Sequence, residues 1–303
     1  MRIPHVLDVT LRDGGYVNRH AWSLSDAIRV VRAVADGGVL SVEVGYFRPE
    51  RHDVDGGTVP AASCPPYYLE KLRATAADTT TLVVMVREPV PAAHYRELAD
   101  LGVGMVRLPT RPTAFDQAER EIAAIHDAGM RAALNLIRVS ELDPAAIASA
   151  AAVAERAAAD VFYLADSNGS LFPEDVPELV EVARQATSVP LGFHAHDGLS
   201  LAFGNSLAAL AAGCEYVDAS LGGLGKGGGN LCLELLASYL RARGEAPFDL
   251  TPLALTSADV ISPLREGGAM ARCESIVSGL LNLNIDEIAN LRAKGGVLPL
   301  LNS

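Results

Sequence analysis

Two histidines separated by one residue, His194 and His196, are the side chains of this chain best suited to chemistry. On a strand they would point to the same side, so both imidazoles could reach one metal ion. Near the N-terminus, Asp13 follows Arg12 at the end of an apolar run and precedes two glycines. A carboxylate there can hold a hard cation, and the guanidinium can hold a substrate oxygen. A salt-bridged turn is the simpler interpretation of the Arg12–Asp13 pair.

Further polar residues follow or interrupt other runs that are typical of strands. The hydroxyl of Ser167 can hold a carboxylate, or the residue can belong to a plain turn. Glu43 stands inside a predicted strand, where a buried carboxylate needs a partner. Arginines that gather at one rim would form a positive well and favour an anionic substrate. The arginines concerned are Arg12, Arg48, Arg87 and Arg138.

A glycine-rich stretch, residues 222–230, ends in Asn230 and contains a G-x-G-x-x-G spacing. A dinucleotide fingerprint belongs in the first strand-to-helix turn of a Rossmann unit, whereas this stretch follows the last predicted strand. We interpret it as a flexible loop whose amides and Asn230 close over the site. A nicotinamide-dependent dehydrogenase is kept as an alternative.

The elements that must position these residues alternate strictly. Short β-branched runs predict strands, and segments with apolar residues every three or four positions predict helices. The predicted strands are 5–11, 41–45, 81–86, 105–108, 132–136, 161–164, 190–194 and 215–219, and the predicted helices are 25–35, 68–75, 92–101, 114–128, 144–158, 174–186, 200–212 and 231–241. Eight such units favour an α/β fold closed into a (β/α)₈ TIM barrel over an open doubly wound sheet.

The alternation stops near residue 244. Pro247, Pro252 and Pro263 punctuate the remainder, and helices are predicted near 263–281 and 285–292. We therefore expect a catalytic barrel over residues 1–244 and a short C-terminal helical extension over residues 245–303.

Composition narrows the function classes. The chain has 303 residues, of which 50% are hydrophobic, and a formal net charge of −12 with a pI near 5.0. Such an acidic protein has no electrostatic reason to bind nucleic acid or an anionic membrane. No long apolar run or signal peptide is evident, so we expect a cytoplasmic protein. The four cysteines form no CxxC pair and are predicted to be reduced packing residues.

The motifs together resemble a known superfamily. T-L-R-D-G, E-V-G-Y, D-S-N-G, H-A-H and G-L-G-K-G-G-G-N occur in this order over most of residues 5–240. The combination resembles the DRE-TIM metallolyases, which include 4-hydroxy-2-oxoacid aldolases, hydroxymethylglutaryl-CoA lyase and the isopropylmalate and homocitrate synthases. Residues 7–16 are most similar to the 4-hydroxy-2-oxovalerate aldolase branch.

The resemblance implies a metal-dependent aldolase that makes or breaks a carbon–carbon bond through a pyruvate-type enolate. It implies that Asp13, His194 and His196 bind a divalent metal, with manganese expected first and magnesium or zinc as alternatives. Arg12 would hold the enolate oxygen and Ser167 the carboxylate of a small 2-oxo acid. Arg48, Arg138 and Asn230 are further substrate-binding candidates. Family habit also implies a homo-oligomer, at least a dimer, and an aldehyde dehydrogenase partner.

The chain departs from that branch at the general base. Tyr16 stands where the resembled aldolases carry a catalytic histidine, and His20 is nearby but displaced. The extension has no tyrosine to supply the usual acid. Tyr16, His20 and a metal-bound water are the candidates for moving the proton, and Glu43 is a further catalytic candidate.

Two other functions stay open. One is a Claisen-type synthase that joins a 2-oxo acid to an acyl-CoA, although such relatives carry longer C-terminal regions. The other is a non-catalytic barrel subunit that kept the motifs.

Overall fold

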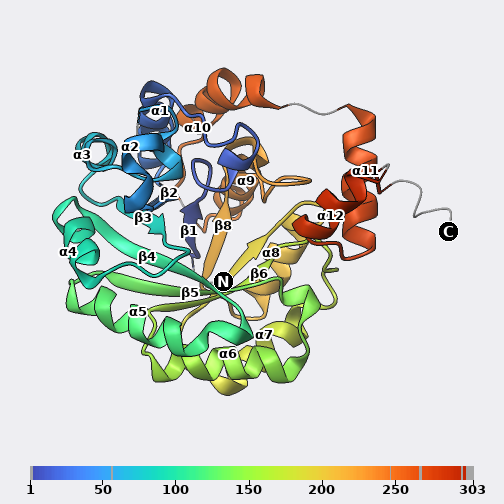
Figure 1. Cartoon of the computed structure of the whole chain (residues 1–303). Helices are drawn as coiled ribbons and strands as arrows, with labels where there is room; N and C mark the ends of the chain where they lie inside the picture. The colour runs from blue at the N-terminus through green and yellow to red at the C-terminus, as the bar shows by residue number, and fades with distance from the viewer. Residues whose placement is uncertain (1–2, 56, 246, 266–267, 295, 298–303) are drawn as a thin grey trace.

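Eight parallel strands close into a barrel in the computed structural model of the chain, and β8 pairs with β1 (Figure 1). The structure describes residues 3–55, 57–245, 247–265, 268–294 and 296–297. The strands are β1 (His5–Asp8), β2 (Ser41–Tyr46), β3 (Thr81–Met85), β4 (Val103–Thr110), β5 (Arg131–Ile137), β6 (Val161–Asp166), β7 (Leu191–Ala195) and β8 (Tyr216–Ala219).

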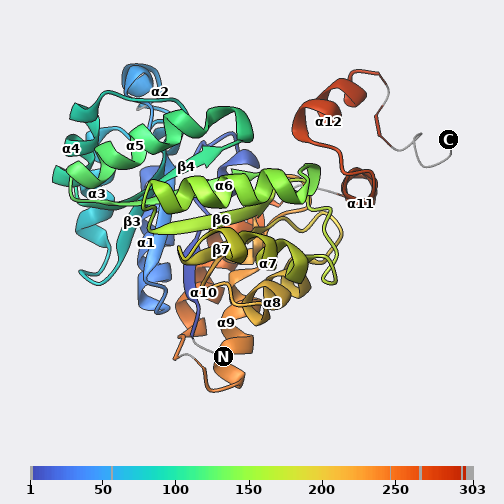
Figure 2. The ribbon, with the colours of Figure 1, turned by 90° about the horizontal axis from the view of Figure 1, so that it is seen from below.

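Helices surround this barrel, and the predicted (β/α)₈ TIM barrel is confirmed (Figures 1 and 2). They are α1 (Leu24–Asp36), α3 (Pro66–Thr75), α4 (Ala92–Asp100), α5 (Phe115–Asp127), α6 (Pro144–Arg156), α7 (Val176–Ala186), α8 (Ala202–Ala211) and α9 (Leu233–Ala242), with a short α2 (His52–Asp55) after β2. Within the described ranges, every helix is too short or too polar to cross a membrane.

The strands are largely apolar on both faces because one face meets the helices and the other fills the barrel. A large buried cluster lies between strands and helices, and a smaller one that includes Met105 and Ala133 fills the interior. Arg107 and Asn135 stand two residues further along the same strands, one layer closer to the carboxyl ends. The barrel interior therefore changes from apolar to charged toward the end where active sites of this fold lie.

The first strand is shorter than predicted. It ends at Asp8 and not at Leu11, because the amide and hydroxyl of Thr10 donate to the Asp8 carboxylate at 3.1 and 2.6 Å. These bonds favour a turn over further ladder pairing. Arg12 and Asp13 consequently lie on a turn above the barrel.

The first part of the extension packs on the barrel and was partly missed. Helix α10 (Leu250–Thr256) was not predicted, because Pro252 suggested a break. The proline stands in the first helical turn, where its missing amide costs no hydrogen bond. The predicted helix over 263–281 was wrong at its start, since a 3₁₀ turn (Ser262–Leu264) comes first and α11 runs over Ala269–Leu280.

The last two helices lie to one side of the barrel, near the carboxyl ends of its strands (Figure 2). The predicted helix over 285–292 is confirmed as α12 (Ile285–Arg292). Arg272 of α11 donates to the carbonyls of Asp197 and Gly198 at 3.1 and 3.2 Å. Asn168 after β6 donates to the side chain of Asn282 at 2.9 Å. The domain boundary at residue 245 stays a prediction.

Candidate metal centre and its cavity

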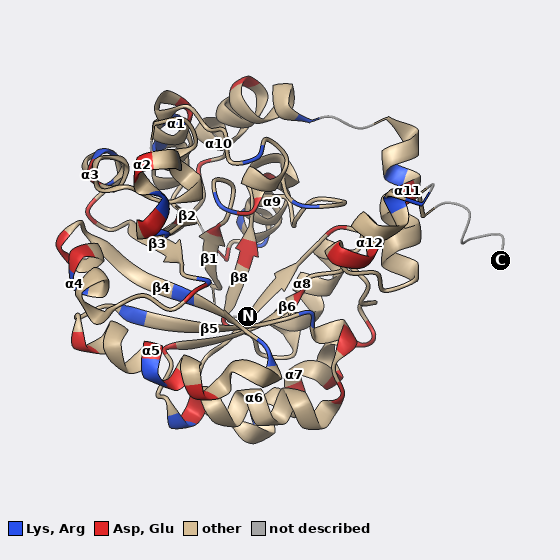
Figure 3. Cartoon of the chain, viewed as in Figure 1, with Lys and Arg blue, Asp and Glu red and all other residues tan. Residues whose placement is uncertain are grey.

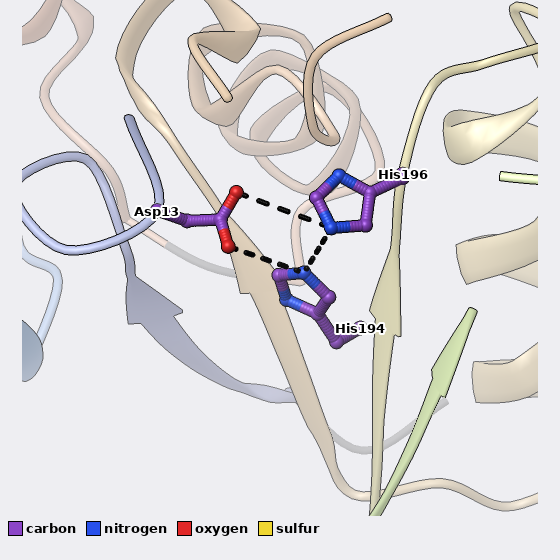
Figure 4. A group of neighbouring side chains, drawn as sticks. All are labelled: Asp13, His194 and His196. Carbon is purple, nitrogen blue, oxygen red and sulfur yellow. Dashed lines mark hydrogen bonds and ion pairs between the residues drawn. The ribbon is translucent and has the colours of Figure 1, made fainter. Parts of the chain in front are cut away.

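Three buried side chains, from the turn after β1 and from the end of β7, point toward one another (Figure 4). The Nε2 atoms of His194 and His196 are 3.3 Å apart. The carboxylate of Asp13 lies 4.0 Å from each, through Oδ2 and Oδ1 respectively. The three residues predicted as metal ligands are thus brought together.

The other ring nitrogens of the two histidines are already engaged. His194 Nδ1 lies 2.8 Å from Oδ2 of Asp218, and His196 Nδ1 lies 3.1 Å from the carbonyl of Gly229. Both partners accept hydrogen bonds, so we assign the protons to Nδ1 and the lone pairs to Nε2. Two facing lone pairs beside a carboxylate repel each other unless a cation lies between them. The donor set therefore fits a divalent metal.

The protonation states agree with that fit. Burial lowers the pKa of His196 to about 3, so its imidazole is neutral near neutral pH. Burial opposes ionisation of Asp13, but the Arg12 guanidinium outweighs it and holds the Asp13 pKa well below its usual range. A neutral imidazole and an ionised carboxylate are the forms that bind metals.

Arg12 is anchored by two carboxylates. Its Nε donates to Oε2 of Glu43 at 2.6 Å, and its Nη1 donates to Oδ2 of Asp13. Arg12 also lines a cavity of about 400 Å³ at the carboxyl ends of the strands, as do Asp13 and both histidines. The rest of the planar fork is positioned for an anionic oxygen in the cavity.

A second arginine, Arg107 of β4, lies wholly buried below the site. It donates to Glu43 at 3.1 Å and to Asp218 at 2.6 Å, and it lies 4.3 Å from the centre of the Tyr163 ring. Figure 3 shows this basic segment on β4 and an acidic one on β8 inside the ring of helices. A continuous series of ion pairs and hydrogen bonds thus runs from Arg12 through Glu43, Arg107 and Asp218 to His194. Sequence reasoning missed Arg107 and Asp218, although a charged residue in an apolar strand had drawn attention to Glu43.

Ser167 and Arg138 lie together on the cavity wall. The Ser167 hydroxyl accepts a hydrogen bond from the Arg138 amide at 3.0 Å, and its own proton is available to a ligand. Arg138 has a left-handed backbone (φ 59°, ψ 44°), which costs about 1–2 kcal/mol for a residue with a Cβ. Its guanidinium donates to Asp286 of α12 at 2.9 Å. Both residues, which were predicted to bind substrate, line the cavity.

Lys226, from the glycine-rich loop, is a cavity residue that sequence reasoning did not single out. Its ammonium donates to the carbonyl of Ser167 at 3.1 Å, and its amide donates to Oδ1 of Asp13 at 3.4 Å. Burial lowers the Lys226 pKa, with Asp13 opposing that shift. A lone lysine among glycines is the only local signal that could have identified it.

Tyr16 and Tyr46 also line the cavity, and their hydroxyls are 2.8 Å apart. Burial raises the Tyr46 pKa above its ordinary value, so Tyr46 keeps its proton. His20 lies behind Tyr16, with the two ring centres 5.4 Å apart. Its ring fits against Gly15, where a Cβ would lie 2.2 Å from His20 Nδ1. Tyr16, and not His20, therefore faces the cavity.

Three other predicted site residues support the wall from outside. Arg48 lies over the Tyr46 ring at 4.9 Å, and Glu43 lies beneath Arg12. Asn230 donates to Oδ1 of Asp13 at 3.2 Å. Within the described part of the chain, Arg48, Glu43 and Asn230 act on cavity residues and do not line the cavity themselves.

Comparison with known proteins gives consistent matches. The HMGL-like family model matches residues 100–260. A 4-hydroxy-2-oxovalerate aldolase from Thermus thermophilus is 34% identical over 277 residues, which cover 86% of this chain and 76% of the relative. A protein of the same name from Geobacillus genomosp. 3 is 30% identical over 279 residues, which cover 90% and 81% of the two chains.

Solved structures match over almost the whole chain. The N-terminal domain of a Bacteroides vulgatus protein described as a candidate aldolase superposes with a TM-score of 0.83 and 25% identity, covering 97% of this chain and 99% of that one. The carboxyl transferase domain of Rhizobium etli pyruvate carboxylase gives a TM-score of 0.76 at 19% identity, covering 97% and 53%. At that identity the likeness concerns the fold alone.

Proposed function

Since the chain belongs to the HMGL-like family, the DRE-TIM metallolyases, we propose that it is a divalent-metal-dependent aldolase acting through a pyruvate-type enolate. Relatives named 4-hydroxy-2-oxovalerate aldolase favour the 4-hydroxy-2-oxo acids as its substrate class. The observation that carries the proposal is the convergence of two imidazole Nε2 atoms and one carboxylate beside a cavity lined by Arg12.

Asp13, His194 and His196 would hold the metal, with manganese as first candidate and magnesium or zinc as alternatives. When bound, the metal supplies Lewis-acid stabilisation of the charge that develops on the 2-oxo acid. Arg12 directs its free donors at the same oxygen. The two carboxylates that anchor Arg12 fix its fork before substrate arrives, so little reorganisation is needed during the reaction.

The carboxylate of the 2-oxo acid has two partners on the wall. Ser167 can donate its hydroxyl proton, since its oxygen already accepts from the Arg138 amide. Lys226 lies against the same segment and contributes a positive charge. Together they orient the 2-oxo acid so that its methyl carbon faces the rest of the cavity.

Tyr16 is the proposed proton carrier. In the addition direction the Tyr16 hydroxyl donates its proton to the forming C4 oxygen. In the cleavage direction the deprotonated Tyr16 oxygen takes that proton back from the substrate's C4 hydroxyl. Tyr46, hydrogen-bonded to it at 2.8 Å, keeps the Tyr16 hydroxyl oriented toward the substrate. His20 is the second candidate, because it packs on Tyr16.

The test combines two activities of one preparation. Metal-loaded protein is expected to cleave 4-hydroxy-2-oxovalerate and to exchange the C3 protons of pyruvate in D₂O, followed by NMR, and a chelator should abolish both. Metal-replete protein that does neither would indicate a non-catalytic barrel. Consumption of a 2-oxo acid only with an acyl-CoA would indicate the Claisen-type synthase.

An assembly of at least two copies and an aldehyde dehydrogenase partner belong to the same proposal. Light scattering of the purified protein tests the first, and co-purification with a dehydrogenase tests the second.

A further inference from the structure

The closed strand order divides the cavity wall into two opposed sides. In a closed barrel of eight strands, β3, β4 and β5 lie across from β7, β8 and β1. The candidate metal ligands follow β1 and β7. Arg87, Arg111 and Arg138 follow β3, β4 and β5 and line the same cavity. Three arginines therefore line the cavity wall that lies across from the candidate metal site.

The protein neutralises this far wall only in part, because Asp286 pairs with Arg138 and acts electrostatically on Arg111. Among the described residues, no carboxylate forms an ion pair with Arg87 or Arg111, and both residues are exposed. Arg138 pairs with Asp286, whose side chain is 74% exposed and can give way to a ligand. In a chain with a net charge of −12, two arginines of one cavity wall that have no ion-pair partner among the described residues favour an anion from outside.

The 2-oxo acid does not account for this wall. In the proposed function its carboxylate and keto oxygens are served by Arg12, Ser167 and Lys226, which follow β1, β6 and β8. A cavity of about 400 Å³ falls within the range of sites that enclose molecules much larger than a three-carbon acid. The space between the two sides is where a carbonyl acceptor for the enolate must lie.

We propose that Arg87 and Arg111, with Arg138 beside them, form a second anion subsite, and that the acceptor aldehyde or ketone carries a carboxylate or phosphate. This inference rests on the proposed aldolase function and names its substrate class more closely. An uncharged short aldehyde would leave the arginines without a partner. A bifunctional acceptor spans the cavity, with its carbonyl at Tyr16 and its acidic group at the arginines.

The reaction balances without any further reagent. A proton leaves C3 of the 2-oxo acid, and the resulting enolate forms a bond from C3 to the acceptor's carbonyl carbon. The carbonyl π electrons move to the acceptor oxygen, which takes a proton from the Tyr16 hydroxyl. The proton removed from C3 restores the protein's protonation through solvent. The product is a 4-hydroxy-2-oxo acid with a second acidic group.

The experiment compares matched acceptors with metal-loaded enzyme and pyruvate. Succinic semialdehyde carries a carboxylate, glyceraldehyde 3-phosphate carries a phosphate, and butanal and glyceraldehyde are their uncharged counterparts. We expect kcat/KM to be about tenfold or more higher for at least one charged member of these pairs. An Arg87→Gln/Arg111→Gln double variant should lose that preference and keep its kcat/KM for the uncharged acceptors.

The control is an Arg96→Gln/Arg120→Gln double variant, which changes the net charge equally on the exposed outer faces of α4 and α5. It should retain the preference of the parent. Exchange of the C3 protons of pyruvate separates failure of this inference from failure of the proposed function. If the metal-loaded parent exchanges these protons but has equal kcat/KM for charged and uncharged acceptors, this inference alone is overturned. If the parent does not exchange them, the proposed function is overturned as well. A preference that survives in the Arg87/Arg111 variant overturns the assigned subsite.

Discussion

Arg12 and Arg107 donate to the same carboxylate oxygen, Oε2 of Glu43, at 2.6 and 3.1 Å. Both guanidinium groups are almost completely buried, and each has a second carboxylate on its outer side, Asp13 for Arg12 and Asp218 for Arg107. Positive and negative groups therefore alternate beneath the metal site. Removing one member leaves its neighbours as uncompensated buried charges.

The first prediction concerns Arg107. Arg107→Met keeps most of the side-chain volume but removes the buried cation that Glu43 and Asp218 share. The free energy of unfolding should therefore fall by about 3–5 kcal/mol. Urea denaturation measures the change. Arg156→Met, which removes an exposed pair with Glu119, should cost no more than about 1 kcal/mol. Equal losses in the two variants would contradict the role given to the buried network.

The second prediction concerns the metal. The parent should contain about one divalent ion per chain, and a His194→Ala/His196→Ala variant should contain almost none. Elemental analysis after dialysis measures both. His126→Ala, which removes a histidine from an outer helix, is the control and should keep the metal. Full occupancy in the double variant would end the assignment of this site.

The third prediction concerns the group that orients His194. Asp218→Asn weakens the acceptor of the His194 Nδ1 proton, so metal affinity should fall by about 10–100-fold. Competition with a chromogenic chelator gives the affinity. An unchanged affinity would mean that Asp218 serves Arg107 alone.

The fourth prediction concerns Arg12. Lysine keeps the charge but lacks the planar fork that Glu43 and Asp13 hold, so Arg12→Lys should lower kcat by about 10²-fold or more. Steady-state kinetics measures the loss, and metal content checks that the site persists. Arg48→Lys, outside the cavity wall, should change kcat far less. Near-normal turnover in Arg12→Lys would make the arginine a purely structural residue.

The fifth prediction separates the two proton-carrier candidates. Tyr16→Phe keeps the ring and removes the hydroxyl that faces the cavity, so aldol cleavage should fall by about 10²–10⁴-fold while C3 exchange of pyruvate survives. His20→Gln should affect both rates little. Cleavage at the parent rate in Tyr16→Phe would transfer the role to another group.

A pH-dependent stability test concerns Asp8, which the mechanism does not use. Burial raises the pKa of this carboxyl from 3.8 to about 7 in the folded chain. Its protonated form therefore stabilises the fold below about pH 4, and that contribution is lost as the pH rises through 7. Between these limits the parent should lose on the order of 4 kcal/mol relative to Asp8→Asn. Chemical denaturation gives the free energy of unfolding of both proteins across this pH range. Asp13 is present in both, so its opposite contribution cancels in the difference between them. Free energies that change in parallel with pH would refute the raised pKa of Asp8.

The sequence predicted the parts of the site that carry their own local signal. His194 and His196 share a strand face, and Asp13 follows an apolar run, so each could be recognised without the fold. Arg107 and Asp218 could not be paired in advance, because their contact depends on how β4 and β8 face each other across the barrel. The early end of β1 depends on a side-chain bond between Thr10 and Asp8, which strand periodicity does not register.

Helix α12 joins the cavity wall through Ile285, Asp286 and Ala289, although it belongs to no strand–helix unit of the barrel. Substitutions in this helix can change the shape and charge of the cavity without altering one hydrogen bond of the strand ladder or one candidate metal ligand. Part of the cavity wall is therefore encoded in a stretch of the gene separate from the barrel and from the candidate metal ligands. Substitutions selected in that stretch can change this part of the wall while the candidate metal ligands stay constant.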